Sequence, residues 1–224
     1  MKKKCPQCKL VNYQTAFECV RCGGALTYIS PSGGSRKPFW QTLLRRGTVL
    51  IMVCLAAIAG FYVSLVYSSR SMTYEQASTI TASIDVLEKQ GFSREAFLLR
   101  RLATFRSTDH WLNSSVVKEN AFAATNFPFG IITVYADFFT YPIDDVERAA
   151  IMLHEAKHLE GADEKEAYEF VWRNREKLGW TNDKYGTSVV FVEIRKQTRD
   201  VSPILFVCDI NPFSDCMETR KPFN

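Results

Sequence analysis

The sequence predicts an α+β protein, mostly helical with a small sheet, whose main domain follows a Cys-rich segment and one long apolar helix. Apolar residues recur at helical spacing between residues 73 and 106 and again after residue 144. Residues 129–139 are instead rich in the β-branched and aromatic residues typical of strands. With 46% hydrophobic and 23% charged residues, the composition is that of a chain that builds a packed core, and it excludes no functional class.

The segment 47–69 contains no charged residue and predicts a transmembrane helix. As a helix, residues 47–67 extend about 31 Å, which matches a hydrocarbon core of roughly 30 Å. The segment lacks the polar stripe of a buried soluble helix. Because 46 residues with a motif of their own precede it, a cleaved signal peptide is not expected. A lipid bilayer is therefore one predicted partner.

Charge is distributed unevenly on the two sides of this helix. Residues 1–46 contain nine Lys or Arg and one acidic residue, whereas residues 71–224 contain 18 basic and 23 acidic residues. The positive-inside rule then predicts a single-pass protein of the cell membrane. Its N-terminus would lie in the cytoplasm, and residues 70–224 would form a periplasmic or extracellular domain.

Four cysteines near the N-terminus form two CxxC motifs ten residues apart, followed directly by two glycines. Four thiolates at this spacing suit tetrahedral Zn²⁺, and glycine permits the positive φ of the turns that present them. Two disulfides disagree with a reducing cytoplasm, and a redox pair lacks a surrounding βαβ pattern. The segment resembles the zinc-ribbon family, which predicts a ribbon over residues 1–28 and one structural zinc ion, with the ligands Cys5, Cys8, Cys19 and Cys22.

The partner of this ribbon is left open by the sequence. Surplus Lys and Arg can contact nucleic acid or acidic headgroups. Charges that orient a membrane anchor explain the same surplus without a partner, so nucleic acid is not expected, and a cytoplasmic protein partner stays open. Residues 29–46, rich in Ser, Gly, Pro and basic residues, predict a flexible linker.

In the main domain, the pattern predicts helices at 73–90 and 93–106, broken at Gly91, and a strand at 129–139. A turn at Tyr141-Pro142 precedes a further helix. Asp144 and Glu147 fit a capping box that begins this helix.

The helix that begins at Asp144 carries the segment His-Glu-Ala-Lys-His, residues 154–158. Residues four apart lie on one helical face, so His154 and His158 can present ring nitrogens to one metal ion. Glu155 would lie beside the ion and accept a proton from a bound water. Two of the chain's three histidines occur in this HExxH pattern.

A helix with HExxH that follows a strand resembles the zincin metallopeptidases, and the resemblance covers roughly residues 115–180. It implies a zincin-like metallopeptidase domain with a catalytic zinc ion and a third protein ligand downstream. Glu164 stands where the metzincin pattern HExxHxxGxxH has its last histidine, and it also begins a sequence similar to the ExxA signature of several gluzincins. Gly161 predicts the end of the first helix, and Asp163 with Glu166 predicts a capping box for a second helix at 163–178.

Glu164 is thus the expected third ligand, and Glu166 and Asp163 are the alternatives. The resemblance implies that Glu155 is the catalytic base for hydrolysis of a protein or peptide substrate. It also implies that substrate adds as a strand to a sheet edge, for which residues 130–135 are a candidate. His110, Tyr168 and Tyr185 are candidates for an oxyanion donor, although a packed or surface position is the better explanation for each of them.

Less can be concluded for the C-terminal part. Residues 187–194 suit a buried strand or a helix that continues to residue 198, because periodicity does not separate the two. Cys208 and Cys216 would form a disulfide or remain free thiols.

Two functional classes remain: a membrane-anchored zinc peptidase, and a non-enzymatic sensor or scaffold with a degenerate zincin domain outside and a partner-binding ribbon inside. The presence of Glu155 favours the peptidase, because a binding site alone needs no base.

Overall fold

The computed structural model describes residues 3–26, 39–113 and 121–206. The chain divides into two compact units, residues 1–56 and residues 57–224. In the described residues the protein is α+β and mostly helical, with one two-stranded and one three-stranded sheet. The predicted fold class is confirmed at this level.

The first unit contains a short hairpin in which β1 (Lys3–Lys4) pairs antiparallel with β2 (Val11–Asn12). The helix α1 (Phe39–Ser68) begins in this unit and ends in the second. Among the described residues, α1 is the one helix long and apolar enough to cross a membrane. It starts before the predicted segment 47–69, and Leu65 is its buried residue. The flexible linker predicted at 29–46 is therefore wrong for residues 39–46, which continue the apolar helix towards the N-terminus, and residues 29–38 lie outside the described residues.

The second unit begins with the end of α1 and continues through helices on both sides of a small sheet. The helices and strands that follow α1 are α2 (Tyr74–Lys89), α3 (Ser93–Arg101), β3 (Thr104–Arg106), β4 (Ala123–Asn126), β5 (Ile131–Val134), α4 (Ala136–Thr140), α5 (Asp145–Leu159), α6 (Glu164–Leu178), α7 (Asn182–Tyr185), α8 (Val189–Val201) and the 3₁₀ helix η1 (Pro203–Phe206).

The three-stranded sheet has the order β3-β5-β4. The central strand β5 runs parallel to β3 and antiparallel to β4, and Ile132 pairs with Phe105 on one side and Thr125 on the other. All four residues of β5 are buried. The strand β4 is therefore an edge of the sheet, and α5 packs against it.

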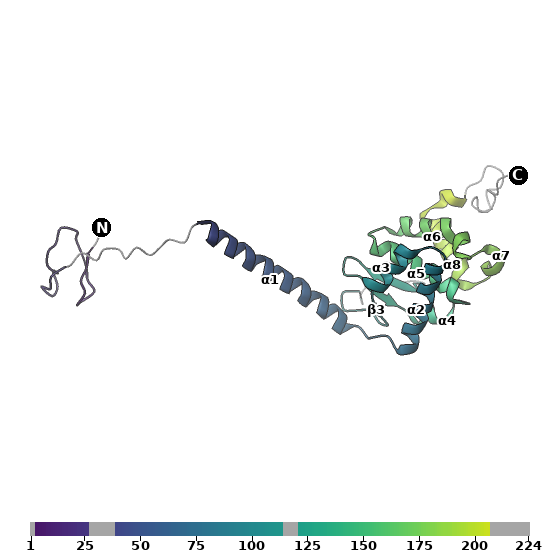
Figure 1. The fold of residues 1–224 in the computed structure, drawn as a ribbon, viewed down its shortest axis with the longest axis horizontal. Coiled ribbons are helices and arrows are strands. Elements are labelled where there is room, and N and C mark those ends of the chain that lie inside the picture. Colours follow the sequence, from purple (N-terminus) through teal and green to yellow (C-terminus); the bar gives the residue numbers. More distant parts are fainter. Residues whose placement is uncertain (1–2, 27–38, 114–120, 207–224) are drawn as a thin grey trace. The chain divides into compact units, whose positions relative to one another are not determined.

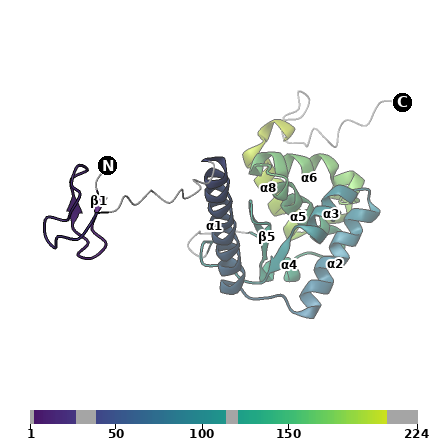
Figure 2. The ribbon, with the colours of Figure 1, turned by 60° about the vertical axis from the view of Figure 1, so that its left-hand side comes forward.

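Helix α5 forms the centre of the second unit. It packs against α2, α3, α6 and β4, and in Figure 1 it lies among these helices. Figure 2 shows it between α6 on one side and α2 on the other. Its middle is buried almost all round, with Ala149, Ala150, Met152, Leu153 and Ala156 at 0% exposure. A helix held in this way positions any side chain it carries rigidly.

Several predicted elements are confirmed and two are wrong in extent. The helices α2, α5 and α6 match the predictions closely, and the segment after Ser188 forms the helix α8 rather than a strand. The predicted helix at 93–106 ends at Arg101, because the amide of Thr104 donates to the carbonyl of Gly130 and the segment joins the sheet as β3. The strand predicted at 129–139 is only β5, and α4 follows it.

Candidate metal centre

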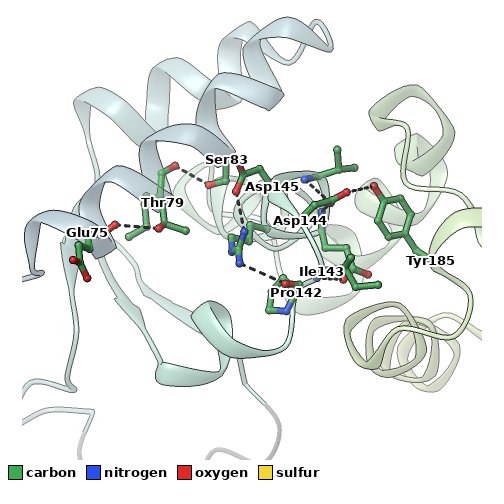
Figure 3. Close-up of polar contacts among 12 residues, drawn as sticks. Glu75, Thr79, Ser83, Pro142, Ile143, Asp144, Asp145 and Tyr185 are labelled. Carbon is green, nitrogen blue, oxygen red and sulfur yellow. Dashed lines mark hydrogen bonds and ion pairs between the residues drawn. The ribbon is translucent and has the colours of Figure 1, made fainter.

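The start of α5 is held by the Asp144 side chain. Its carboxylate accepts hydrogen bonds from the amides of Val146 at 3.0 Å and Glu147 at 3.2 Å, as the predicted N-cap requires. The Tyr185 hydroxyl donates to the other oxygen of this carboxylate at 2.8 Å (Figure 3). Lys184 also donates to that oxygen, at 3.1 Å. The cap thus ties the first turn of α5 to α7.

The second member of the predicted capping box, Glu147, is fully buried. Its carboxylate accepts from the amide of Ile143 at 2.9 Å, one residue before the N-cap, rather than from Asp144 itself. It also accepts from the Trp180 indole at 3.3 Å and from the Ser188 hydroxyl. A buried carboxylate with three donors is satisfied, and it connects α5 to the start of α8.

At the other end, α5 stops at Leu159, one residue after His158. Gly161 has φ of 87°, a left-handed conformation that a glycine adopts without strain, and its amide donates to the carbonyl of His158 at 3.0 Å. Asp163 then caps α6 by accepting from the amide of Glu166 at 2.8 Å. This sharp reversal puts Glu164, the first residue of α6, beside the histidines.

The structure brings His154, His158 and Glu164 together as one group that can hold a metal ion. The Nε2 atoms of the histidines are 3.0 Å apart, and the Oε2 atom of Glu164 lies 3.3 Å from His154 Nε2 and 3.6 Å from His158 Nε2. Ligands of tetrahedral zinc at about 2.0–2.1 Å from the ion lie roughly 3.3 Å from one another. The three residues therefore fit a zinc ion.

Glu166 and Asp163, the alternative ligands, are not part of this group. Asp163 is engaged as the N-cap of α6, and Glu166 is exposed. Glu164 is the acidic residue whose place at the start of α6 directs it towards the imidazoles.

The orientation of His158 leaves its outer nitrogen for a metal. Its Nδ1 lies 2.9 Å from the carbonyl oxygen of Ala162, which can only accept, so in the neutral imidazole Nδ1 carries the proton and Nε2 has the lone pair. Metal-binding histidines are commonly held by such a bond. The Ala162 carbonyl is available because the chain leaves α5 at Gly161.

Charges in the centre reinforce one another. Burial disfavours a proton on His158, but the hydrogen bond to Glu164 and that to the Ala162 carbonyl prevail and raise the pKa of His158 to about 9. The bonds from His154 and His158 hold the pKa of Glu164 well below its usual value. The carboxylate thus stays ionised and attracts positive charge to this point, whether a proton or a cation.

The two histidine side chains are nearly buried, whereas the side chain of Glu164 is exposed to solvent. The side chains of His154 and His158 are 12% and 14% exposed, whereas that of Glu164 is 68% exposed. The centre is thus held from one side by α5 and open on the other. An open fourth position is the feature that separates catalytic from structural zinc sites.

Glu155 lies next to the first histidine and is only 4% exposed. Its Oε2 accepts a hydrogen bond of 2.7 Å from the hydroxyl of Thr125, on the edge strand β4. Thr125 was not predicted from the sequence, because a threonine in a four-residue strand belongs to no motif. It orients the carboxylate that the sequence identifies as the base.

Of the three candidate oxyanion donors, Tyr168 lines the site. Its ring centroid lies 4.2 Å from that of His154, and its hydroxyl donates to Gln197 of α8. Tyr185 instead bonds Asp144 at the far end of α5, and His110 is fully buried and does not line the cleft. Gln197 is a further polar group at the site that the sequence did not indicate.

A cleft of about 600 Å³ lies over the centre. The chain from Ala121 to Thr125, the second half of α5, the start of α6 and one face of α8 line it. Its walls mix the polar groups described above with apolar side chains, namely Phe122, Phe127, Ile151, Ile194 and Val201. The strand beside the cleft is β4, so the expectation that residues 130–135 form a substrate-binding edge is wrong, because β5 is paired on both sides.

The ribbon cysteines form the second group that can hold a metal ion. The sulfur atoms of Cys5, Cys8, Cys19 and Cys22 all lie within 4.8 Å of one another. The pairs Cys5–Cys22 and Cys8–Cys19 are 3.5 Å and 3.4 Å apart, close to the roughly 3.8 Å between thiolates that bind tetrahedral zinc at about 2.3 Å.

The two turns that present these sulfurs share one geometry. The residue after each CxxC motif has a positive φ, 61° at Lys9 and 66° at Gly23. Glycine meets this need in the second turn, as expected, and a lysine meets it in the first. Backbone amides near the sulfur, that of Arg21 foremost, lower the pKa of Cys19 to about 6, which favours the thiolate that binds metal.

No protein-family model, no curated protein and no solved structure matches this chain. The two groups that can hold a metal ion are therefore the features from which a function can be argued.

Proposed function

We propose that this protein is a membrane-anchored zinc-dependent metallopeptidase with a zincin-like domain. The observation that carries the proposal is the convergence of His154, His158 and Glu164 at zinc-ligand spacing, next to the buried carboxylate of Glu155 and inside an open cleft. A structural zinc site does not need Glu155, an acidic residue beside the ligands that does not itself bind the ion. A peptidase needs it as a base.

Zinc in this centre would lower the pKa of a water molecule towards 7 and polarise the scissile carbonyl. Glu155 takes the proton from the attacking water and passes it to the leaving amine. Thr125 keeps the Glu155 carboxylate in place for both transfers through its 2.7 Å hydrogen bond. Tyr168, which packs on His154 and lines the cleft, is the candidate donor to the developing oxyanion, and its hydroxyl would turn from Gln197 to donate there.

The substrate would bind as an extended strand along β4. This strand pairs with β5 on one side, and its other side faces the cleft, where residues 121–125 form part of the wall. Main-chain hydrogen bonds to an edge strand hold a peptide without regard to its sequence. The apolar side chains of Phe122, Ile151 and Ile194 then favour substrates with an apolar residue near the cleavage point.

We further propose the topology that the charges predict. The helix α1 would cross the membrane once, with the four-cysteine ribbon and the rest of the chain up to residue 46 in the cytoplasm and residues 70–224 outside. The ribbon would bind a structural zinc ion through its four cysteines.

The experiment compares the wild-type chain with Glu155→Gln, both purified in detergent, in cleavage of unstructured proteins. The variant Glu166→Gln is the matched control, since Glu166 is an exposed glutamate on the adjacent helix. Wild type and control should cleave, and Glu155→Gln should keep its zinc and lose activity by about 10²–10⁴-fold. Equal activity of wild type and Glu155→Gln would refute the mechanism. Zinc-loaded wild type without activity would support the sensor alternative.

A further inference from the structure

The end of α1 is fixed to the second unit by a dense set of hydrogen bonds. The guanidinium of Arg106 donates to the carbonyls of Val66 and Ser69, so a cation caps the carboxyl end of the helix. The amide of Arg70 donates to the hydroxyl of Thr108 at 2.8 Å. A flexible tether would leave the domain free to turn, whereas this junction sets its orientation relative to the outer end of the helix.

Side chains before the junction also pack on the domain. The ring of Phe61 contacts Trp111, with centroids 5.6 Å apart, and Phe129, with centroids 5.2 Å apart. The Trp111 indole donates to the hydroxyl of Ser64 at 3.1 Å, and the hydroxyl groups of Tyr62 and Thr104 are 2.8 Å apart. The last two turns of α1 therefore belong to the fold of the domain.

These contacts place part of the domain at a definite depth. The chain has no charged residue between Arg46 and Arg70. A hydrocarbon core of roughly 30 Å takes up about 20 helical residues, so a span that begins after Arg46 reaches about residue 66. Ser64 then lies about 3 Å and Phe61 about 8 Å inside the outer boundary of the hydrocarbon, a depth that the apolar groups of interfacial segments reach. The groups that contact them lie there too.

The surface beside these contacts has the chemistry of a membrane interface. Trp111 and Leu112 are 48% and 42% exposed although both are large and apolar, and Phe127 is 61% exposed. Tryptophan favours the interfacial layer of a bilayer, where its ring is in contact with acyl chains and its N–H is bonded. We call Trp111, Leu112, Phe127 and Phe129 the aromatic face.

This face adjoins the metal centre. Phe127 and Phe129 lie on the turn between β4 and β5, and Phe129 packs on Phe61 of α1. Phe127 lines the cleft, and a Cβ placed on Gly161 would lie 3.7 Å from its ring. The same short turn thus joins the end of the membrane helix to the rim of the cleft.

We infer that the aromatic face rests in the interfacial layer of the outer leaflet, so that the cleft opens at the membrane surface. Polypeptide segments that lie at or emerge from the bilayer are the substrates that can enter it there. The inference requires α1 to span the membrane, as in the proposed function, but it does not require peptidase activity.

Tryptophan fluorescence tests the inference in the full chain reconstituted into phosphatidylcholine vesicles, with lipids brominated either near the headgroup or near the chain terminus. The chain has four tryptophans, and Trp172 and Trp180 are fully buried in the core. The variant Trp40→Phe leaves Trp111 as the one that lipid can reach. Adding Trp111→Phe gives the background from the core, and phenylalanine keeps a ring against Phe61.

We expect headgroup-proximal bromines to quench Trp40→Phe well above the double variant, and terminal bromines to quench it less. Equal quenching of the two variants would overturn the inference and would mean that water or another protein covers the face. The single variant Trp111→Phe, which retains Trp40 near the other end of α1, checks the anchor separately. If Trp40 is quenched and Trp111 is not, only the inference fails; if the chain does not float with vesicles, the anchor fails as well.

Discussion

Replacing Asp144 by alanine should destabilise the domain, because this one side chain holds the start of the helix that carries His154, Glu155 and His158. Its carboxylate accepts two backbone amides of α5 and one hydrogen bond each from Tyr185 and Lys184. Loss of an N-cap costs about 1 kcal/mol, and loss of the tyrosine bond about 1 kcal/mol more. The ion pair with Lys184 is not counted, since the lysine side chain is 61% exposed and water screens the pair.

The expected loss is therefore about 2 kcal/mol, or a decrease in Tm of about 4–8 °C for a domain of this size. Thermal unfolding followed by circular dichroism in detergent measures it. Asp145→Asn is the control, since Asp145 is half-exposed and pairs only locally with Arg148. A change below about 0.5 kcal/mol in Asp144→Ala would show that the cap does not hold α5.

The same residue predicts a pH dependence. Burial raises the pKa of Asp144, but the hydrogen bonds from Tyr185 and Lys184 prevail and lower this pKa below its usual value. A carboxyl with a lower pKa in the folded than in the unfolded state stabilises the protein above its unfolded pKa, and this stabilisation is lost as the pH falls through the folded pKa. The stability difference between wild type and Asp144→Asn should therefore shrink below about pH 4.

Two further predictions concern the centre itself. Glu164→Gln should weaken zinc binding at the histidines by more than about 100-fold, because even the loss of an outer hydrogen-bond partner costs about 10–100-fold in metal affinity. Glu166→Gln should leave the zinc affinity unchanged. A competition titration with a chromophoric chelator measures both affinities. Thr125→Val should keep zinc but lower kcat by at least about 10-fold, since Glu155 loses its orienting bond, and Thr125→Ser should restore most of the rate. Zinc affinity equal in the two glutamate variants, or full activity in Thr125→Val, would contradict these assignments.

Much of the metal centre could be predicted from the sequence because local signals specify it. The spacing of His154 and His158 places both on one helical face, and Gly161 and Asp163 mark the end of one helix and the start of the next. These signals act within a few residues. They also indicate Glu164, because an N-cap at Asp163 makes Glu164 the first residue of the second helix, where its side chain can turn towards the histidines of the first.

What could not be predicted depends on contacts distant in sequence. Thr104 leaves the helical pattern because it pairs with the chain near Gly130, and no local feature indicates that pairing. The edge strand β4 is short and carries Thr125 without any motif, so neither the edge nor the partner of Glu155 was found. The packing of Trp111 on the end of α1 is of the same kind. Cys208 and Cys216 lie outside the described residues, and their pairing stays a prediction.

The central claim is that the HExxH helix and Glu164 bind a zinc ion of their own, and the zinc content of a chain without the ribbon site tests it most directly. In Cys5→Ser/Cys8→Ser, purified in detergent and measured by atomic emission, the one remaining group that can bind zinc in the described part of the chain is that of the histidines. We predict one zinc ion per chain, lost when His158→Ala is added. A double-serine variant that is folded and free of zinc would contradict the claim.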